Sequence, residues 1–427
     1  MTKNTVTTEI LAPAGEWSSL IAATDAGANA VYFGVEGLNM RSSARNFTAD
    51  ELPDIMQHCR DSGIRGYLTL NTVVYEHELT MLNKILDAAA SAGVNAVIAS
   101  DFAVIQGAHT RGIELHISTQ MSLSNSHALS FFYHKFGVRR FVMARECTLD
   151  DIALIRRNLA QIHNINADTV ELEAFAHGAM CVAVSGRCFM SQFQYGKSAN
   201  RGECLQPCRR EYRVTNIEED QEFDLGNHYV MSPRDLCTLP FVEKLLEAGI
   251  SSLKIEGRNR SPEYAATVVR AYREVVDAWH NRQSSPDSAR EFAALKEQHM
   301  NLMKQVFNRG FSQGFFMGQP IDAWTKSGGS LATHRKLYVG FVTNYYARPG
   351  VAEVLVQDNP LTTGDQIIFT GNKTGIVEQT AESMQVEHSP IETVERGSMA
   401  AIKVKSPVRR NDKLYKLAEL PTERPPD

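Results

Sequence analysis

The chain has 427 residues, of which 43% are hydrophobic and 22% charged, and its formal net charge is −5. A chain of this length can bury a large core and divide into two or three domains. The net charge argues against a uniformly basic nucleic-acid binder, and no apolar run is long enough to span a membrane. The start, MTKNTVTTEILAPAG, lacks an apolar signal region, which predicts a cytoplasmic protein.

Short apolar segments alternate with amphipathic segments of helical length through the first two thirds of the chain. The eight predicted strands cover about residues 8–12, 30–34, 66–70, 96–100, 114–118, 139–143, 170–175 and 251–256. Crossovers such as ELPDIMQHCRDSG carry apolar residues at i, i+3 and i+4. This alternation predicts an α/β protein with a (β/α)8 TIM-like barrel over residues 1–280. A doubly wound open sheet is the main alternative.

The alternation breaks between the seventh and eighth predicted strands. Residues 177–227 form a cysteine-rich insertion there. Beyond the barrel, residues 281–335 read as a helical connector, and residues 336–418 read as short strands separated by turns. We therefore expect a small all-β C-terminal domain, followed by a tail at 419–427.

Four of the seven cysteines lie in this insertion with the spacing C-x6-C-x15-C-x3-C. They are Cys181, Cys188, Cys204 and Cys208. Four thiolates in a reducing compartment are the ligand set of an iron–sulfur cluster. Structural zinc sites usually place paired thiolates two to four residues apart, so zinc is the weaker interpretation, followed by unligated cysteines. Of the three remaining cysteines, which read as structural, Cys237 is the one possible rival ligand.

Polar residues follow several of the predicted strands, at the end where barrel enzymes carry their active sites. The catalytic candidates are His177, Arg145, Glu256 and Arg258. The substrate-binding candidates are Asn71, Gln120, Arg187, Lys254 and Arg260. The basic members of both sets could bind phosphate or carboxylate groups. A single polar residue at a strand end, such as Asp101, is more often a helix cap than a catalyst.

Residues 173–191, EAFAHGAMCVAVSGRCFMS, closely resemble the signature of the collagenase-like peptidases, family 32 of the unassigned peptidases. The resemblance extends to EILAPAG, AVYFG, HISTQ, RGECLQPCRREY and SLKIEGRNRSPEY, and so covers nearly the whole chain. Some members of the family hydroxylate tRNA uridine, ribosomal RNA cytidine or ubiquinone precursors. The contiguous CLQPC, the β-rich C-terminal region and the length favour the branch that hydroxylates tRNA uridine at C5.

The resemblance implies specific cofactors and partners. It implies a [4Fe-4S] cluster on Cys181, Cys188, Cys204 and Cys208, prephenate as the source of the hydroxyl group, tRNA as the substrate, and iron–sulfur assembly proteins as partners. We therefore expect an oxygen-independent tRNA hydroxylase acting on wobble uridine, with hydroxylation of a ribosomal RNA base or a ubiquinone precursor as alternatives.

The family name suggests a different activity, proteolysis. A peptidase needs an activated nucleophile or a metal-bound water, and the chain contains neither G-x-S-x-G nor H-E-x-x-H. A thiol peptidase that pairs one of the four cysteines with His177 is the remaining form of this hypothesis. A non-catalytic accessory protein that carries the cluster is a third, weaker interpretation.

Overall fold

The computed structural model describes residues 8–42, 45–210, 212–218, 221–224, 232–282, 285–320, 323–325 and 329–420. Most of the predicted tail, residues 421–427, lies outside these ranges. No helix within them is long and apolar enough to cross a membrane.

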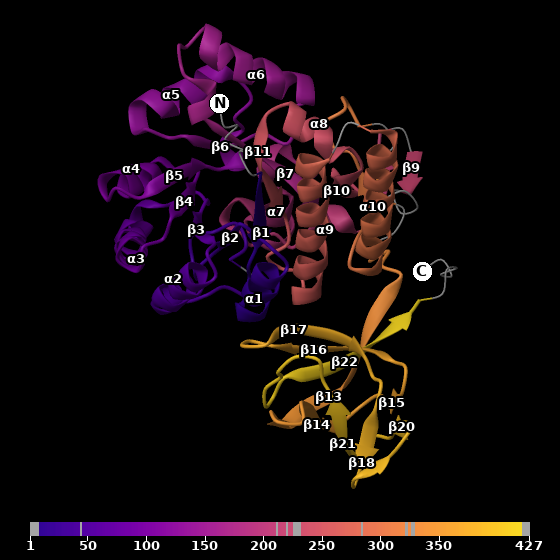
Figure 1. The fold of residues 1–427 in the computed structure, drawn as a ribbon. Coiled ribbons are helices and arrows are strands. Elements are labelled where there is room, and N and C mark those ends of the chain that lie inside the picture. Colours follow the sequence, from indigo (N-terminus) through magenta and orange to yellow (C-terminus); the bar gives the residue numbers. More distant parts are fainter. Residues whose placement is uncertain are drawn as a thin grey trace.

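Eight parallel strands form a closed barrel, which confirms the predicted fold class (Figure 1). The strands are β1 (Glu9–Pro13), β2 (Ala30–Phe33), β3 (Arg65–Leu70), β4 (Ala96–Ala99), β5 (Glu114–Ile117), β6 (Arg140–Val142), β7 (Glu171–Gly178) and β11 (Ile250–Ile255). The last strand, β11, pairs with both β1 and β7, and this closure excludes the doubly wound sheet. The strands are buried on both faces, which is why they read as nearly continuous apolar runs.

Helices surround the barrel and bury their apolar faces against it. They are α1 (Trp17–Asp25), α2 (Leu52–Asp61), α3 (Leu79–Ala92), α4 (Phe102–Thr110), α5 (Ser126–Phe136), α6 (Leu149–Gln161), α8 (Val242–Glu247) and α9 (Pro262–Asn281). Local signals fix several of their ends. Asp101 accepts a hydrogen bond from the backbone N–H of Ala103 at the start of α4, and Thr148 forms a capping box with Asp151 at the start of α6.

The chain between β7 and β11 leaves the barrel and returns to it. It contains α7 (Met190–Tyr195), the hairpin β8 (Arg213–Asn216) and β9 (Gln221–Asp224), and β10 (Asp235–Cys237). Strand β10 pairs antiparallel with the end of β7, with Cys237 opposite His177. After α9, helix α10 (Pro286–Gln305) packs on α9, and β12 (Phe311–Ser312) pairs with β10. The insertion is thus tied to the C-terminal end of the barrel.

The C-terminal region is an antiparallel sheet with its own apolar core. Its eight strands are β13 (His334–Tyr346), β14 (Val351–Val356), β16 (Gln366–Gly371), β17 (Gly375–Thr380), β18 (Met384–Val386), β19 (Ser389–Pro390), β21 (Met399–Lys403) and β22 (Lys413–Glu419). A two-stranded pair, β15 (Leu361–Thr362) and β20 (Thr393–Val394), joins them. We call residues 334–419 the β-module.

The β-module contacts the barrel through β17, which lies against α1 and α9 (Figure 1). Ile376 packs against the barrel core, and Lys336 forms an ion pair with Glu263 of α9 at 2.7 Å. Gly375 approaches Ile21 so closely that a Cβ atom would lie 2.7 Å from its Cγ2, and its φ of +64° also favours glycine. This contact places the β-module beside the starts of α1 and α9, at the C-terminal end of the barrel.

Candidate functional site

The four cysteines of the insertion line one cavity at the mouth of the barrel. The cavity has a volume of about 200 Å³, and Cys181, Cys188, Cys204 and Cys208 all contribute to its wall. The thiol of Cys208 interacts electrostatically with the other three. Burial raises the pKa of Cys204 and of Cys208. The fold therefore brings thiols separated by up to 27 positions in the chain to the wall of one cavity.

Three of the four sulfur atoms accept a backbone hydrogen bond from the residue two positions ahead. The donors are the N–H groups of Ala183 to Cys181 at 3.5 Å, Met190 to Cys188 at 3.4 Å, and Gln206 to Cys204 at 3.4 Å. Hydrogen bonds of this kind stabilise thiolates and tune the potential of iron–sulfur clusters. The loop is therefore folded so that backbone N–H groups can stabilise negative charge on sulfur atoms that line the cavity.

Two glycines hold the insertion close to the barrel. Gly202 has φ +82°, and a Cβ atom there would lie 2.2 Å from the carbonyl oxygen of Asn39. Gly178 has φ +108°, and its Cβ would lie 2.5 Å from the carbonyl oxygen of Glu256. Only glycine satisfies both the backbone conformation and the approach at these positions. The cysteine cavity is thereby fixed directly over the strand ends.

A layer of arginines lies between the cysteine cavity and the barrel interior. Arg41 forms an ion pair with Glu256 at 2.5 Å, and the guanidinium of Arg145 lies 4.0 Å from the centre of the Phe175 ring. Arg258 donates to the hydroxyl of Thr69 at 3.0 Å. These three arginines line an inner cavity of about 50 Å³, where Glu256 is the only acidic lining residue among those described. Arg41, Arg145 and Glu256 line the cysteine cavity as well.

The titration of this layer follows from burial and from its excess of positive charge. Burial alone would raise the pKa of Glu256, but Arg41, Arg145 and Arg258 outweigh it and lower that pKa to about 2. Burial lowers the pKa of Arg258 to about 10, and it also lowers that of Arg145. An anion entering the cavity would relieve this burial cost, so the layer is suited to bind negatively charged groups.

Several of the predicted residues meet in this region. Asn71 donates to the amide oxygen of Gln120 at 3.2 Å, and both line the inner cavity. Lys254 lies deeper in the barrel and forms a buried ion pair with Glu173 at 2.7 Å. Arg260 lies further out, lines the cysteine cavity and stacks 3.5 Å from the centre of the Phe307 ring.

Other predicted residues lie elsewhere. Arg187 is exposed and donates to the backbone carbonyl of Gln120 at 2.6 Å, which fixes the loop rather than lining either cavity. Asp101 acts as a helix cap and also accepts from the N–H of Val74 at 3.0 Å. The rival ligand Cys237 is buried on β10 beside Met300, and burial raises its pKa to about 12.

His177 lies on the helix side of β7, not in the mouth. It packs among Tyr264, Tyr272 and Phe311, its Nδ1 has no hydrogen-bond partner among the described residues, and burial lowers its pKa to about 3. The cause is an irregularity in the pairing of β7 with β11, where the register shifts between Lys254 and Ile255. The extra residue in β7 reverses the alternation of side chains. Phe175 therefore points into the barrel, whereas the His177 side chain, two residues later, points toward the helices.

Three further arginines line the cysteine cavity without having been predicted. Arg41, Arg209 and Arg309 belong to it, and Arg209 donates to the carbonyl of Met180 at 2.7 Å. Arg209 directly follows Cys208 in the sequence, so it could have been predicted to lie near the cysteine cavity. Arg41 lies in an irregular segment after β2, and Arg309 follows α10, so neither has a local pattern that marks it.

The donor set of the cavity fits an iron–sulfur cluster. It consists of four thiols around one space, three of them with N–H donors, which matches the thiolate ligation of such clusters. Within the described ranges, no three His, Cys, Asp or Glu side chains form a group that could hold a single metal ion.

The fold and the cavity define the class of protein: a TIM-like barrel with a thiol- and arginine-lined cavity at its mouth. Comparison with known proteins then gives the family. The model of peptidase family U32 matches residues 15–326, so the chain belongs to this family. A "Collagenase" of Porphyromonas gingivalis is 43% identical, with 96% of this chain and 97% of that protein aligned.

Two relatives carry names of RNA-modifying proteins. A "tRNA hydroxylation protein" of Bacillus subtilis is 32% identical over 85% of this chain and 83% of its own. A "23S rRNA 5-hydroxycytidine synthase" of Escherichia coli is 32% identical over 75% of this chain and 47% of its own. The relatives are thus named as hydroxylases or as a peptidase, which supports an enzyme without specifying its type.

Proposed function

We propose that this protein is an oxygen-independent RNA hydroxylase of the cytoplasm that converts a tRNA wobble uridine to 5-hydroxyuridine. The observation that carries the proposal is the position of four thiols directly over a buried arginine layer at the barrel mouth. The relatives named for tRNA hydroxylation and for 5-hydroxycytidine synthesis support the same chemistry.

In this proposal Cys181, Cys188, Cys204 and Cys208 hold a [4Fe-4S] cluster, delivered by iron–sulfur assembly proteins. When bound, the cluster supplies one-electron redox chemistry. Replacing a base C–H by C–OH with a hydroxyl group at the oxidation level of water removes two electrons and one proton from the base. The proposed reaction therefore includes an oxidised one-electron carrier protein that accepts these two electrons. The four thiolates would hold the cluster, and the backbone N–H donors to Cys181, Cys188 and Cys204 would stabilise its negative charge.

The proposed source of the hydroxyl group is prephenate, a dicarboxylate. Arg145 and Arg258 would bind its carboxylates through charge-assisted hydrogen bonds, while Glu256 holds Arg41 in place. The amide pair of Asn71 and Gln120 would orient the polar remainder of the co-substrate. Arg258 is buried and Arg145 is half-buried, so water is partly excluded there and each of these contacts would be strengthened.

A peptidase is the second candidate, because the relative with 43% identity is named a collagenase. The geometry gives less support to it. Among the described residues, no histidine lines the cysteine cavity, and His177 is turned toward α9 with a pKa lowered to about 3 by burial. A cysteine peptidase requires a base within hydrogen-bond reach of its thiol.

The test of the proposed function is nucleoside mass spectrometry of tRNA and ribosomal RNA from a strain lacking the gene. We expect loss of 5-hydroxyuridine from the tRNA pool, and restoration by the wild-type gene but not by the Cys188→Ser variant. Cys237→Ser, which removes a thiol outside the cavity, should restore the nucleoside as well as wild type does. Unchanged nucleosides in both pools together with cleavage of denatured collagen would favour the peptidase.

The cofactor is tested independently of the substrate. Anaerobically purified protein should be brown, with about four irons and four sulfides per chain. Cys204→Ala should abolish the visible absorption, whereas Cys237→Ala should preserve it. Colourless protein with stoichiometric zinc would contradict the assignment.

A further inference from the structure

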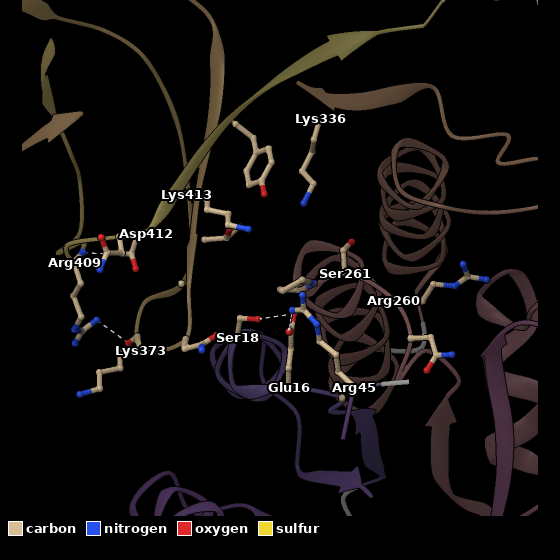
Figure 2. A pocket seen from close by; sticks show the side chains of 18 of the residues that line it. Glu16, Ser18, Arg45, Arg260, Ser261, Lys336, Lys373, Arg409, Asp412 and Lys413 are labelled. Carbon is tan, nitrogen blue, oxygen red and sulfur yellow. Dashed lines mark hydrogen bonds and ion pairs between the residues drawn. The ribbon is translucent and has the colours of Figure 1, made fainter. Parts of the chain in front are cut away.

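A second, larger cavity lies where the β-module meets the barrel (Figure 2). This cleft has a volume of about 860 Å³. One wall comes from the barrel and includes Arg45 and Arg260, and the other comes from the β-module and includes Lys373, Arg409 and Lys413 (Figure 2). We call it the interdomain cleft.

The interdomain cleft is strongly basic in a protein whose net charge is negative. Eight basic side chains and two acidic ones line it. The basic residues are Arg45, Arg258, Arg260, Lys336, Lys373, Arg409, Arg410 and Lys413. Since the whole chain has a formal charge of −5, this concentration of positive charge is local and not a property of the surface in general.

Several of these basic side chains already have partners within the protein. Arg45 pairs with Glu16 at 2.5 Å and Lys336 pairs with Glu263. The carboxylate of Asp412 accepts from the Thr374 hydroxyl and from the N–H of Arg409, so it serves to shape the loop.

The remaining lysines and arginine of the loops are exposed. Lys373, Arg410 and Lys413 form no ion pair with any described carboxylate. Lys373 lies on the loop between β16 and β17, and Arg410 and Lys413 lie just before and at the start of β22; the two segments meet, since the Arg409 guanidinium donates to the carbonyl of Lys373 at 2.7 Å. Solvated cations on converging loops are suited to bind a row of phosphates.

The interdomain cleft adjoins the cysteine cavity, because the two spaces share lining residues. Asn259 and Arg260, at the end of β11, line both spaces. A small anion held beside Lys373 would remain in the cleft, but a polymer could extend past Arg260 and place one of its units at the barrel mouth. The adjacency of the two spaces therefore favours a polyanion over a small metabolite.

We propose that the interdomain cleft binds the phosphate backbone of the RNA substrate and guides the target nucleotide past Arg260 toward the cysteine cavity. This inference rests on the proposed function and adds the surface that positions the RNA. Both walls contribute phosphate contacts, so the β-module acts as an RNA-positioning element and not only as a structural appendage. A contact of this kind carries affinity and little sequence specificity.

The test replaces three cations of the cleft while preserving the fold. The variant is Lys373→Gln, Arg410→Gln and Lys413→Gln combined. The matched control, Arg348→Gln, Arg396→Gln and Lys405→Gln, removes the same charge from exposed positions of the β-module that do not line the cleft. Binding of unmodified tRNA transcript is measured by filter binding across a salt series, and circular dichroism melting checks the fold.

The cleft variant should bind on the order of 10- to 100-fold more weakly at about 0.1 M salt, with the slope of log Kobs against log salt reduced by about three. The control variant should match wild type in both respects. Equal binding by the cleft and control variants, when wild type binds tRNA and restores the hydroxylated nucleoside, overturns this inference and leaves the proposed function intact. Absence of tRNA binding by wild type, with unchanged nucleosides, overturns both. Retention of an acidic peptide but not of tRNA by the cleft would assign it to a protein partner and overturn the RNA assignment.

Discussion

The barrel interior contains two charged layers that differ in how completely their charges are paired. Near the N-terminal ends of the strands, Arg140 forms ion pairs with Glu9, with Glu171 at 2.5 Å and with Glu173 at 3.6 Å. Tyr67 donates to Glu9 at 2.7 Å. In this layer the carboxylates outnumber the guanidinium and every charge has a partner.

In the layer at the mouth, basic side chains outnumber carboxylates. Arg41, Arg145 and Arg258 share one carboxylate, that of Glu256. In barrels of this type, the N-terminal end of the strands serves stability and the C-terminal end serves chemistry. The fully paired layer around Arg140 should therefore contribute mainly to stability. The layer at the mouth, where positive charge is in excess, should contribute mainly to ligand binding. The predictions below test this difference.

Replacement of Arg140 should cause the largest loss of stability. Arg140→Met leaves Glu9 without its cation, whereas Glu173 keeps its ion pair with Lys254 at 2.7 Å, and breaking a largely buried pair such as Arg140–Glu9 costs about 3–5 kcal/mol. Urea unfolding monitored by tryptophan fluorescence measures the loss. The double variant Glu9→Gln, Arg140→Met should recover part of it, because the uncompensated charge is removed. A loss below about 1 kcal/mol would show that the lower layer is not the stabilising one.

Acid should selectively weaken the contribution of Glu256. Its pKa is lowered from an ordinary value of 4.5 to about 2, so its stabilising effect is complete above about pH 4.5 and is lost as the pH falls toward 2. This difference corresponds to about 3 kcal/mol. The gap in unfolding free energy between wild type and Glu256→Gln should therefore be widest near pH 6 and should narrow below pH 4.5. A gap that is constant from pH 6 to pH 3 would mean that the arginines do not hold Glu256 ionised.

Replacement of Arg258 should affect ligand binding more than folding. Arg258 is buried among like charges, and its one described hydrogen bond goes to Thr69. Arg258→Met should raise the KM for prephenate about 10- to 100-fold, the effect of one charge-assisted hydrogen bond to a carboxylate. The unfolding free energy should change by less than in Arg140→Met. An unchanged KM together with a large loss of stability would place Arg258 in the structural network instead.

The sequence predicted the parts of the molecule that depend on local pattern. All eight barrel strands and the cysteine loop were found because buried parallel strands read as apolar runs and because four thiols at ligand spacing are rare. Arg41 and Arg309 were missed, since their place in the cavity depends on long-range packing. The orientation of His177 depends on the bulge in β7, and the interdomain cleft depends on how β17 contacts α1. Neither feature has a sequence pattern.

The smallest expected changes in stability and in KM come from single polar residues at strand ends. They should separate residues that line the mouth of the barrel from residues that only cap a helix. Asn71 and Asp101 lie just after the neighbouring strands β3 and β4, but Asp101 caps α4 whereas Asn71 contacts Gln120 in the inner cavity. Asp101→Ala should cost about 1 kcal/mol of stability, the value of a helix cap, and leave the KM for prephenate unchanged. Asn71→Ala should raise that KM at a similar or smaller cost in stability. If Asp101→Ala changed the KM as much as Asn71→Ala does, the active surface would have to extend along the whole rim of the barrel, and the contrast between its paired and unpaired groups would lose its functional meaning.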